Sequence, residues 1–183
     1  MVANEQAARP TPVVVVMGVS GSGKTTIGAL VADAKSVPFV DADDLHPIDN
    51  VKKMAAGTPL DDEDRWPWLD IVGRRLQEAE DSGEGVVMAC SALRRVYRDR
   101  IRATAPSTIF LHLHGSLEVL TARIEGRSGH FMPPALLSSQ METLEALTED
   151  EAGYVLDIGQ SVEQMIDEAL PALQSIRDEM PHG

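Results

Sequence analysis

The stretch 18-GVSGSGKT-25 lies between four consecutive valines, 13-VVVV-16, and a segment of helical character that begins at Thr26. It matches the pattern G-x-x-x-x-G-K-[ST], in which glycines allow a tight turn and successive backbone N–H groups point inward. The positive end of the following helix adds to the attraction for an anion. Because the pattern stands between a strand and a helix, it predicts a phosphate-binding loop for a nucleoside triphosphate.

The residues of this loop have separate expected roles. The ammonium group of Lys24 is expected to reach the β- and γ-phosphates, and the hydroxyl of Thr25 is expected to ligate Mg²⁺. Backbone and side-chain contacts to the nucleotide are expected along the whole loop, at Gly18, Ser20, Gly21, Ser22, Gly23, Lys24, Thr25 and Thr26.

Length and composition indicate one globular domain. The chain has 183 residues, of which 43% are hydrophobic and 25% charged. We expect a loose N-terminal tail at 1–12 and a single domain at 13–180. The net charge of −13 argues against nucleic acid and anionic membranes as partners, so anion binding is expected to be local. With one cysteine, no signal-peptide pattern and no long apolar run, the expected location is the cytoplasm.

Short apolar runs alternate with helical patterns along the chain. Strands are expected at 13–17, 38–42, 85–92, 108–115 and 154–158. Helices are expected at 24–36, 44–56, 62–81, 93–104, 116–126 and 161–179. This alternation predicts an α/β fold with a parallel sheet covered by helices on both faces. The segment 127–140 interrupts the pattern with Gly and two prolines, and we expect a lid at about 124–140.

Acidic residues gather where the second expected strand ends, in 41-DADDLHP-47. Carboxylates at the carboxyl end of a parallel strand face the crevice in which ligands bind. We expect Asp41 to lie near the metal and Asp43 to act as a base toward a substrate hydroxyl. The alternative is that the acids cap the next helix, a role that suits Asp44. The GTPase signature N-K-x-D is absent, which favours a small kinase over a GTPase.

Several motifs together resemble those of the gluconate kinases, a group within the shikimate-kinase-like branch of the P-loop kinases. The matching stretches are 17-MGVSGSGKTT-26, 41-DADDLHP-47, 50-NVKKMAAGTPLDDEDRWPWL-69, 90-CSALRRVYRDRIR-102, 129-GHFMP-133 and 138-SSQMETLE-145. The resemblance spans nearly the whole domain. It implies ATP- and Mg²⁺-dependent phosphorylation of D-gluconate, a five-stranded parallel sheet of order 2-3-1-4-5, and a homodimer.

A sugar acid needs cations for its carboxylate and polar groups for its hydroxyls. The resemblance to shikimate kinases favours Arg65 for the carboxylate. Arg94 and Arg98, which share a helix face, are also expected to point toward the cleft. The remaining expected substrate contacts are His46, Lys53, Ser91 and His130, together with the base Asp43.

Two arginines near the expected lid are candidates for the phosphates. Arg123 and Arg127 are spaced i,i+4 at the end of a helix. In related kinases such lid arginines stabilise the charge that develops during phosphoryl transfer. Arginines also favour a helix C-terminus for its dipole, which is the structural alternative. We expect Arg127 to take the catalytic role and Arg123 to assist in nucleotide binding.

Three other functions remain open at this point. One is a kinase that acts on another small hydroxy acid or sugar, and a second is an ATP-sensing protein without transferase activity. A third, a kinase of nucleic-acid 5′-hydroxyls, would need a long basic stripe that this acidic chain lacks. Cys90 is expected to be a buried structural residue, and the pair His112 and His114 is a weak metal site.

Overall fold

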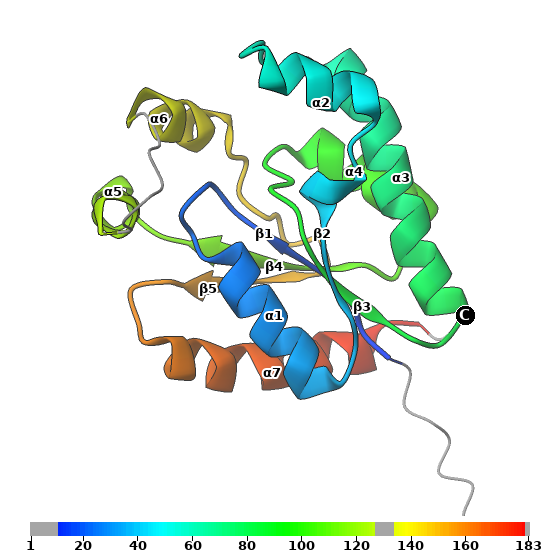
Figure 1. Cartoon of the computed structure of the whole chain (residues 1–183). Helices are drawn as coiled ribbons and strands as arrows, with labels where there is room; N and C mark the ends of the chain where they lie inside the picture. The colour runs from blue at the N-terminus through cyan, green and yellow to red at the C-terminus, as the bar shows by residue number, and fades with distance from the viewer. Residues whose placement is uncertain (1–10, 127–133, 182–183) are drawn as a thin grey trace, which may run out of the picture.

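The computed structural model describes residues 11–126 and 134–181 (Figure 1). Five parallel strands form one sheet of order β2-β3-β1-β4-β5. The strands are β1 (Val13–Met17), β2 (Phe39–Asp41), β3 (Val86–Ala89), β4 (Ile109–His114) and β5 (Gly153–Asp157). This order confirms the fold and sheet order that the sequence led us to expect.

Helices cover both faces of the sheet, so the fold has three layers (Figure 1). The helices are α1 (Lys24–Lys35), α2 (Ile48–Ala55), α3 (Asp62–Asp81), α4 (Arg95–Thr104), α5 (Leu117–Glu125), α6 (Pro134–Thr143) and α7 (Val162–Glu179). Alternate residues of β1 face opposite cores: Val14 and Val16 pack with α1 and α7, whereas Val13 and Val15 pack with α3 and α4. A strand buried on both faces explains the unbroken run of valines.

Strand register determines where the site lies. Ala89, the last residue of β3, pairs with Asp41 of β2 on one side and with Val16 of β1 on the other. The acidic end of β2 is therefore one strand removed from the strand that leads into the phosphate-binding loop. Because all strands are parallel, both segments emerge at the same edge of the sheet.

Two local features differ from the sequence-based expectation. The expected helix at 44–56 is divided into a 3-10 helix, η1 (Ala42–Leu45), and α2. Pro47 explains the break, because it restricts the preceding His46 to an extended conformation, with ψ at 136°. The second difference is α6, which lies in a segment that we expected to be an irregular excursion; a proline at its first position is compatible with a helix start.

The buried His112 gives the fold a dependence on acid. His112 is 2% exposed, and among the described residues neither of its ring nitrogens has a hydrogen-bond partner. Burial, with help from the neighbouring His114 and Arg98, lowers the pKa of His112 to about 4. The unfolded chain therefore takes up a proton on this ring at a higher pH than the folded chain does.

We predict that the free energy of unfolding falls as the pH drops from 6.5 toward 4, the pKa values of His112 in the unfolded and folded states. The full effect of this one group is about 3 kcal/mol below pH 4. Urea denaturation at a series of pH values measures it. His112→Leu should flatten the curve, whereas His114→Gln, a change at the exposed neighbour, should retain most of the slope. Equal slopes for His112→Leu and the unchanged protein would contradict the prediction.

Candidate active site

The loop between β1 and α1 has the backbone geometry of an anion cradle. Gly18, Gly21 and Gly23 have φ values of 147°, 80° and 96°, a region that side chains other than glycine rarely adopt. At Gly21 a Cβ atom would also lie 2.7 Å from Ile124 of α5. The loop therefore depends on glycine both for its turn and for its close approach to α5.

Lys24 lies over this loop and contacts its backbone. Its Nζ donates hydrogen bonds of 3.0 Å to the carbonyl oxygens of Gly18 and of Val19. Burial lowers the pKa of the Lys24 ammonium, and the carboxylates of Asp43 and Asp41 oppose that shift. The ammonium thus stands between the loop and the acids at the end of β2.

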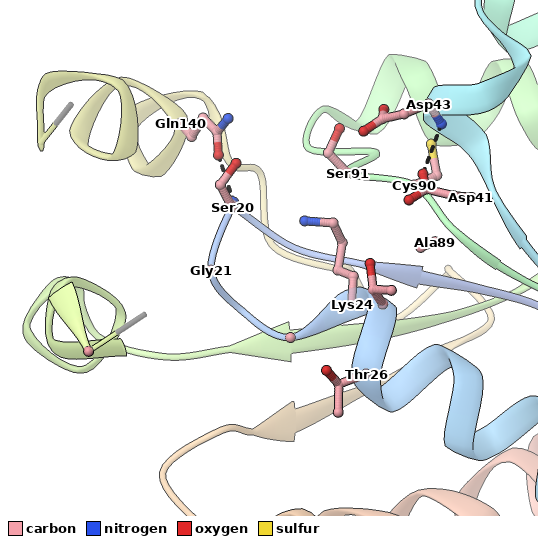
Figure 2. A pocket seen from close by; sticks show the side chains of 13 residues that line it. Ser20, Gly21, Lys24, Thr26, Asp41, Asp43, Ala89, Cys90, Ser91 and Gln140 are labelled. Carbon is pink, nitrogen blue, oxygen red and sulfur yellow. Dashed lines mark hydrogen bonds between the residues drawn. The ribbon is translucent and has the colours of Figure 1, made fainter. Parts of the chain in front are cut away.

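A pocket of about 900 Å³ opens beside the loop (Figure 2). Its walls come from the phosphate-binding loop, the end of β2, the end of β3 and α6. The lining residues are Ser20, Gly21, Gly23, Lys24, Thr25, Thr26, Asp41, Asp43, Ala89, Cys90, Ser91, Gly126 and Gln140. The pocket brings together most of the expected nucleotide-binding residues. Of the expected nucleotide-binding residues that the structure describes, Gly18, Ser22 and Arg123 are not among the lining residues, and Ser22 is fully buried.

The two acids of β2 and η1 face this pocket. Asp41 Oδ1 accepts a 3.0 Å hydrogen bond from the backbone N–H of Asp43 and so begins η1. The pKa of Asp43 is raised, first by partial burial of its carboxyl in the pocket wall and then by the charge of Asp41. The pocket wall displaces only part of the water around this carboxylate, since 83% of the Asp43 side chain is exposed. A carboxylate of raised pKa facing a lysine across a pocket is suited to accepting a proton.

The oxygen donors present fit Mg²⁺. The hydroxyl of Thr25 and the carboxylate of Asp41 line the same pocket. Magnesium in kinase sites takes one or two protein oxygens and completes its shell with substrate phosphates and water. The described residues contain no group of three or more His, Cys, Asp or Glu that could hold a metal by itself. Two such donors would suit a metal that is bound together with a nucleotide.

His46 is fixed beside the acids by packing and hydrogen bonding. Its ring stacks on Trp68 at a centroid distance of 4.2 Å, and its Nδ1 lies 3.2 Å from Asn50 Nδ2. Its Nε2 lies 4.0 Å from Asp43 Oδ1. Burial lowers the pKa of His46, and the neighbouring Asp43 works in the opposite direction. The ring thus presents Nε2 toward the Asp43 carboxylate.

The expected carboxylate ligands Arg65 and Arg94 meet around Tyr97. Their guanidinium carbons lie 5.6 and 5.3 Å from the centre of the Tyr97 ring. Asp62 accepts from Arg94 at 2.8 Å and from the Tyr97 hydroxyl at 2.6 Å, and Arg65 lies 3.6 Å from the same carboxylate. Both arginines are partly exposed, with 33% and 35% of their side chains open to solvent.

Lys53 and Ser91 occupy different surroundings. Lys53 on α2 forms a 2.5 Å ion pair with Asp64, and Asp64 closes a capping box with Asp61 at the start of α3. The Lys53 ammonium therefore joins α2 to α3. Ser91 follows β3 and lines the pocket directly (Figure 2).

Arg98 does not point toward the cleft, so that expectation is corrected. Its side chain is wholly buried and forms a two-pronged ion pair with Glu151, at 2.6 and 3.0 Å. Its other N–H groups donate to the carbonyls of Ala92, Leu93 and Ala146. The i,i+4 spacing from Arg94 could not reveal that Arg98 is covered by a distant loop that contains Glu151. All five donors are used, so Arg98 fixes the turn that follows Ser91.

The residues near α5 and α6 are partly outside the described chain. Arg123 donates to the carbonyl of Ile158 and lies beside the loop, 3.9 Å from the position of a Cβ on Gly23. Arg127 and His130 lie outside the described residues. Gln140 of α6, a residue of the quoted stretch 138-SSQMETLE-145 to which we assigned no role, lines the pocket and accepts a 2.8 Å hydrogen bond from the N–H of Ser20. Only the fold brings these two residues together, since 120 positions separate them.

Fold and site together define a P-loop kinase of small molecules, and the comparisons with known proteins agree. Residues 20–174 match the family described as Shikimate kinase. The thermosensitive gluconokinase of Escherichia coli is 44% identical over 164 residues, which cover 89% of this chain and 88% of that protein. A probable gluconokinase of Xenopus tropicalis is 41% identical over 85% of this chain and 90% of that protein.

A solved structure gives the same result. The crystal structure of a gluconokinase from Sinorhizobium meliloti superimposes with a TM-score of 0.83 at 46% identity, and covers 93% of this chain and 95% of that one. The chain therefore belongs to the shikimate kinase family, among its gluconokinases.

The buried pair of Arg98 and Glu151 yields a test of stability. Burial alone would raise the pKa of the Glu151 carboxyl, but hydrogen bonds from Arg98 and from the Thr148 N–H hold it below the usual range. Glu151→Gln leaves a buried guanidinium without its counter-charge. We predict a loss of about 3–5 kcal/mol in the free energy of unfolding, measured by urea denaturation.

An exposed pair of similar geometry is the matched control. Arg100 and Asp70 form two hydrogen bonds of 2.7 and 2.9 Å, but 45% and 39% of their side chains are exposed. Asp70→Asn should therefore cost less than about 1 kcal/mol. Similar losses for both variants would show that burial does not govern the strength of the Arg98 pair.

Proposed function

We propose that this chain catalyses the transfer of the γ-phosphoryl group of ATP to the C6 hydroxyl of D-gluconate, with Mg²⁺. The observation that carries the proposal is the pocket in which Lys24 and Thr25 of the phosphate-binding loop face Asp41 and Asp43. Nucleotide-binding and proton-accepting groups thus share one cavity. Several gluconokinases with high identity over most of the chain support the choice of substrate.

The proposed chemistry is one in-line displacement. Asp43 accepts the proton of the C6 hydroxyl while the hydroxyl oxygen forms a bond to the γ-phosphorus, and the bond from that phosphorus to the bridging oxygen of ADP breaks. The raised pKa of Asp43 favours this role, since a carboxylate of higher pKa accepts a proton more readily. Lys24, Arg127 and Arg123 balance the charge on the transferred group. Mg²⁺, held by Thr25 and Asp41, would neutralise the charge on the phosphates when bound.

Recognition of the sugar acid is assigned to the wall formed by η1, α3 and α4. His46 and Ser91 are assigned to the acceptor end of the substrate, and Arg65 and Arg94 to its carboxylate. Both arginines already share the carboxylate of Asp62. They are thus oriented before substrate binds, which reduces the entropy lost on binding. Lys53 and His130 are proposed as further contacts to the hydroxyls.

Two other parts of the proposal concern the whole molecule. We propose a homodimer, which size-exclusion chromatography with light scattering tests directly. The proposed location is the cytoplasm, where the ATP that the reaction consumes is supplied. No helix in the described part of the chain is long and apolar enough to cross a membrane.

The first experiment measures ADP release with ATP and Mg²⁺ across gluconate, other aldonic acids, shikimate and neutral sugars. We expect turnover that depends on gluconate, and little with glucose, because glucose lacks the carboxylate for Arg65 and Arg94. Preference for a different acid would favour another hydroxy-acid kinase. ADP release that ignores every acceptor would favour the ATP-sensing alternative.

Asp43→Asn is expected to lower kcat by about 10²–10⁴-fold, because an amide cannot accept the hydroxyl proton. ATP affinity should change far less, as Asp43 does not hold the nucleotide. Steady-state kinetics and calorimetric ATP binding separate the two effects. Asp44→Asn is the control, since Asp44 is an exposed neighbour outside the pocket lining. Near-normal turnover in Asp43→Asn would remove Asp43 as the base.

A further inference from the structure

Gln140 lies in the stretch 138-SSQMETLE-145 and makes a contact for which we expected no role. Its Oε1 accepts a 2.8 Å hydrogen bond from the backbone N–H of Ser20, in the middle of the phosphate-binding loop (Figure 2). A backbone N–H can only donate, so the atom of the amide that faces the loop must be the oxygen. A side-chain oxygen therefore occupies an N–H group of the kind that binds phosphate oxygens.

The contact is made from a helix that is anchored to the core on one face. Leu137 of α6 is 2% exposed, and Met141 of α6 and Leu144, just after the helix, pack against the same hydrophobic core. The Leu144 N–H also donates to the Gln140 carbonyl at 2.9 Å. The backbone of Gln140 is thus held in place, and its side chain spans from α6 to the loop.

The same peptide unit is held from its other side by Lys24. The carbonyl of Val19 and the N–H of Ser20 belong to one planar peptide, and in a trans peptide these groups point in opposite directions. Lys24 Nζ donates to that carbonyl at 3.0 Å, while Gln140 accepts from that N–H. The orientation of this single peptide therefore satisfies both side chains at once.

The position of Lys24 indicates which phosphate is concerned. The backbone N–H groups of such a loop cradle the α- and β-phosphates, and its lysine reaches the β- and γ-phosphates. The peptide of Val19 and Ser20 lies against the Lys24 ammonium and precedes the helix by several residues. This peptide therefore adjoins the ammonium group that reaches the γ-phosphate, which is the terminal phosphate of ATP.

We propose that Gln140 is a positioning residue of the phosphate-binding loop, which holds the Ser20 N–H until an oxygen of the terminal phosphate of ATP replaces it. Gln140 then acts as an internal competitor that lowers the affinity for ATP more than for ADP. This inference rests on the proposed use of ATP, but not on the identity of the sugar acid. It links occupancy of the nucleotide site to the contact between α6 and the loop.

Gln140→Met tests the proposal, because methionine has a similar length and offers no oxygen. We expect calorimetry, without a sugar acid, to show ATP binding about five-fold tighter, the ratio equivalent to one net hydrogen bond. ADP affinity should change by less than about two-fold. Gln140→Glu, which keeps the oxygens and adds a negative charge, should weaken ATP binding more than ADP binding.

The control is Gln174→Met on α7, where the glutamine is also partly buried and accepts a hydrogen bond from Lys35. That variant should bind both nucleotides as the unchanged protein does. A loss of ATP affinity in Gln140→Met, no change, or an equal change for ATP and ADP would overturn the proposal. Damage to the loop would weaken binding of both nucleotides, so the selective gain for ATP distinguishes competition from a merely structural role.

The measurements distinguish a failure of the proposed role of Gln140 from a failure of the proposed sugar-acid substrate. If the unchanged protein binds ATP and the variants behave as expected, but gluconate gives no turnover, the sugar-acid assignment fails and the role of Gln140 stands. If gluconate turnover is present and Gln140→Met does not gain affinity for ATP, only the role of Gln140 fails. If the unchanged protein does not bind ATP, both fail.

Discussion

Burial of β1 on both faces is the constraint on which the rest of the structure depends. All five of its residues have no exposed surface, so strands must pair on either side and helices must cover both faces. Such a strand can meet solvent only where it ends. The glycine-rich loop begins at that point, and the parallel register brings Asp41 to the same edge through Ala89. The position of the pocket is therefore a consequence of the packing of a hydrophobic strand.

The sequence predicts the parts of the site that are local. The loop geometry follows from glycines within eight residues, and the acids at the end of β2 follow from strand alternation and motif. Arg98 shows the limit of such reasoning, because Glu151, its partner, lies 53 positions away in a segment of no regular pattern. Gln140 shows the same limit over 120 positions. Contacts between distant loops depend on tertiary packing, which no local pattern records. The break at Pro47 has a local cause, yet the expectation of one helix at 44–56 missed it.

Cationic side chains gather near the pocket, although the net charge of the whole chain is unfavourable for binding anions. A net charge of −13 repels an anionic nucleotide and an anionic sugar acid alike. The cations near the site are nevertheless concentrated and oriented: Lys24 lies over the loop, and Arg65 and Arg94 flank Tyr97 with Asp62 between them. Short-range hydrogen bonds from these cations to an anionic ligand would thus oppose the weak long-range repulsion between the ligand and the negative chain. Salt screens that repulsion. Such a surface favours small anions that enter the pocket over extended polyanions.

The environment of Cys90 has a consequence for experiments on this protein. It is the chain's single cysteine, it lines the pocket wall, and burial raises the pKa of its thiol to about 12. Thiolate is the reactive form, so alkylating reagents should react with the folded protein very slowly. Alkylation of Cys90 therefore requires a transient opening of the structure at the end of β3. The rate of Cys90 modification thus reports local opening of the pocket wall at the end of β3. A bound ligand that holds the strand ends together should slow this modification.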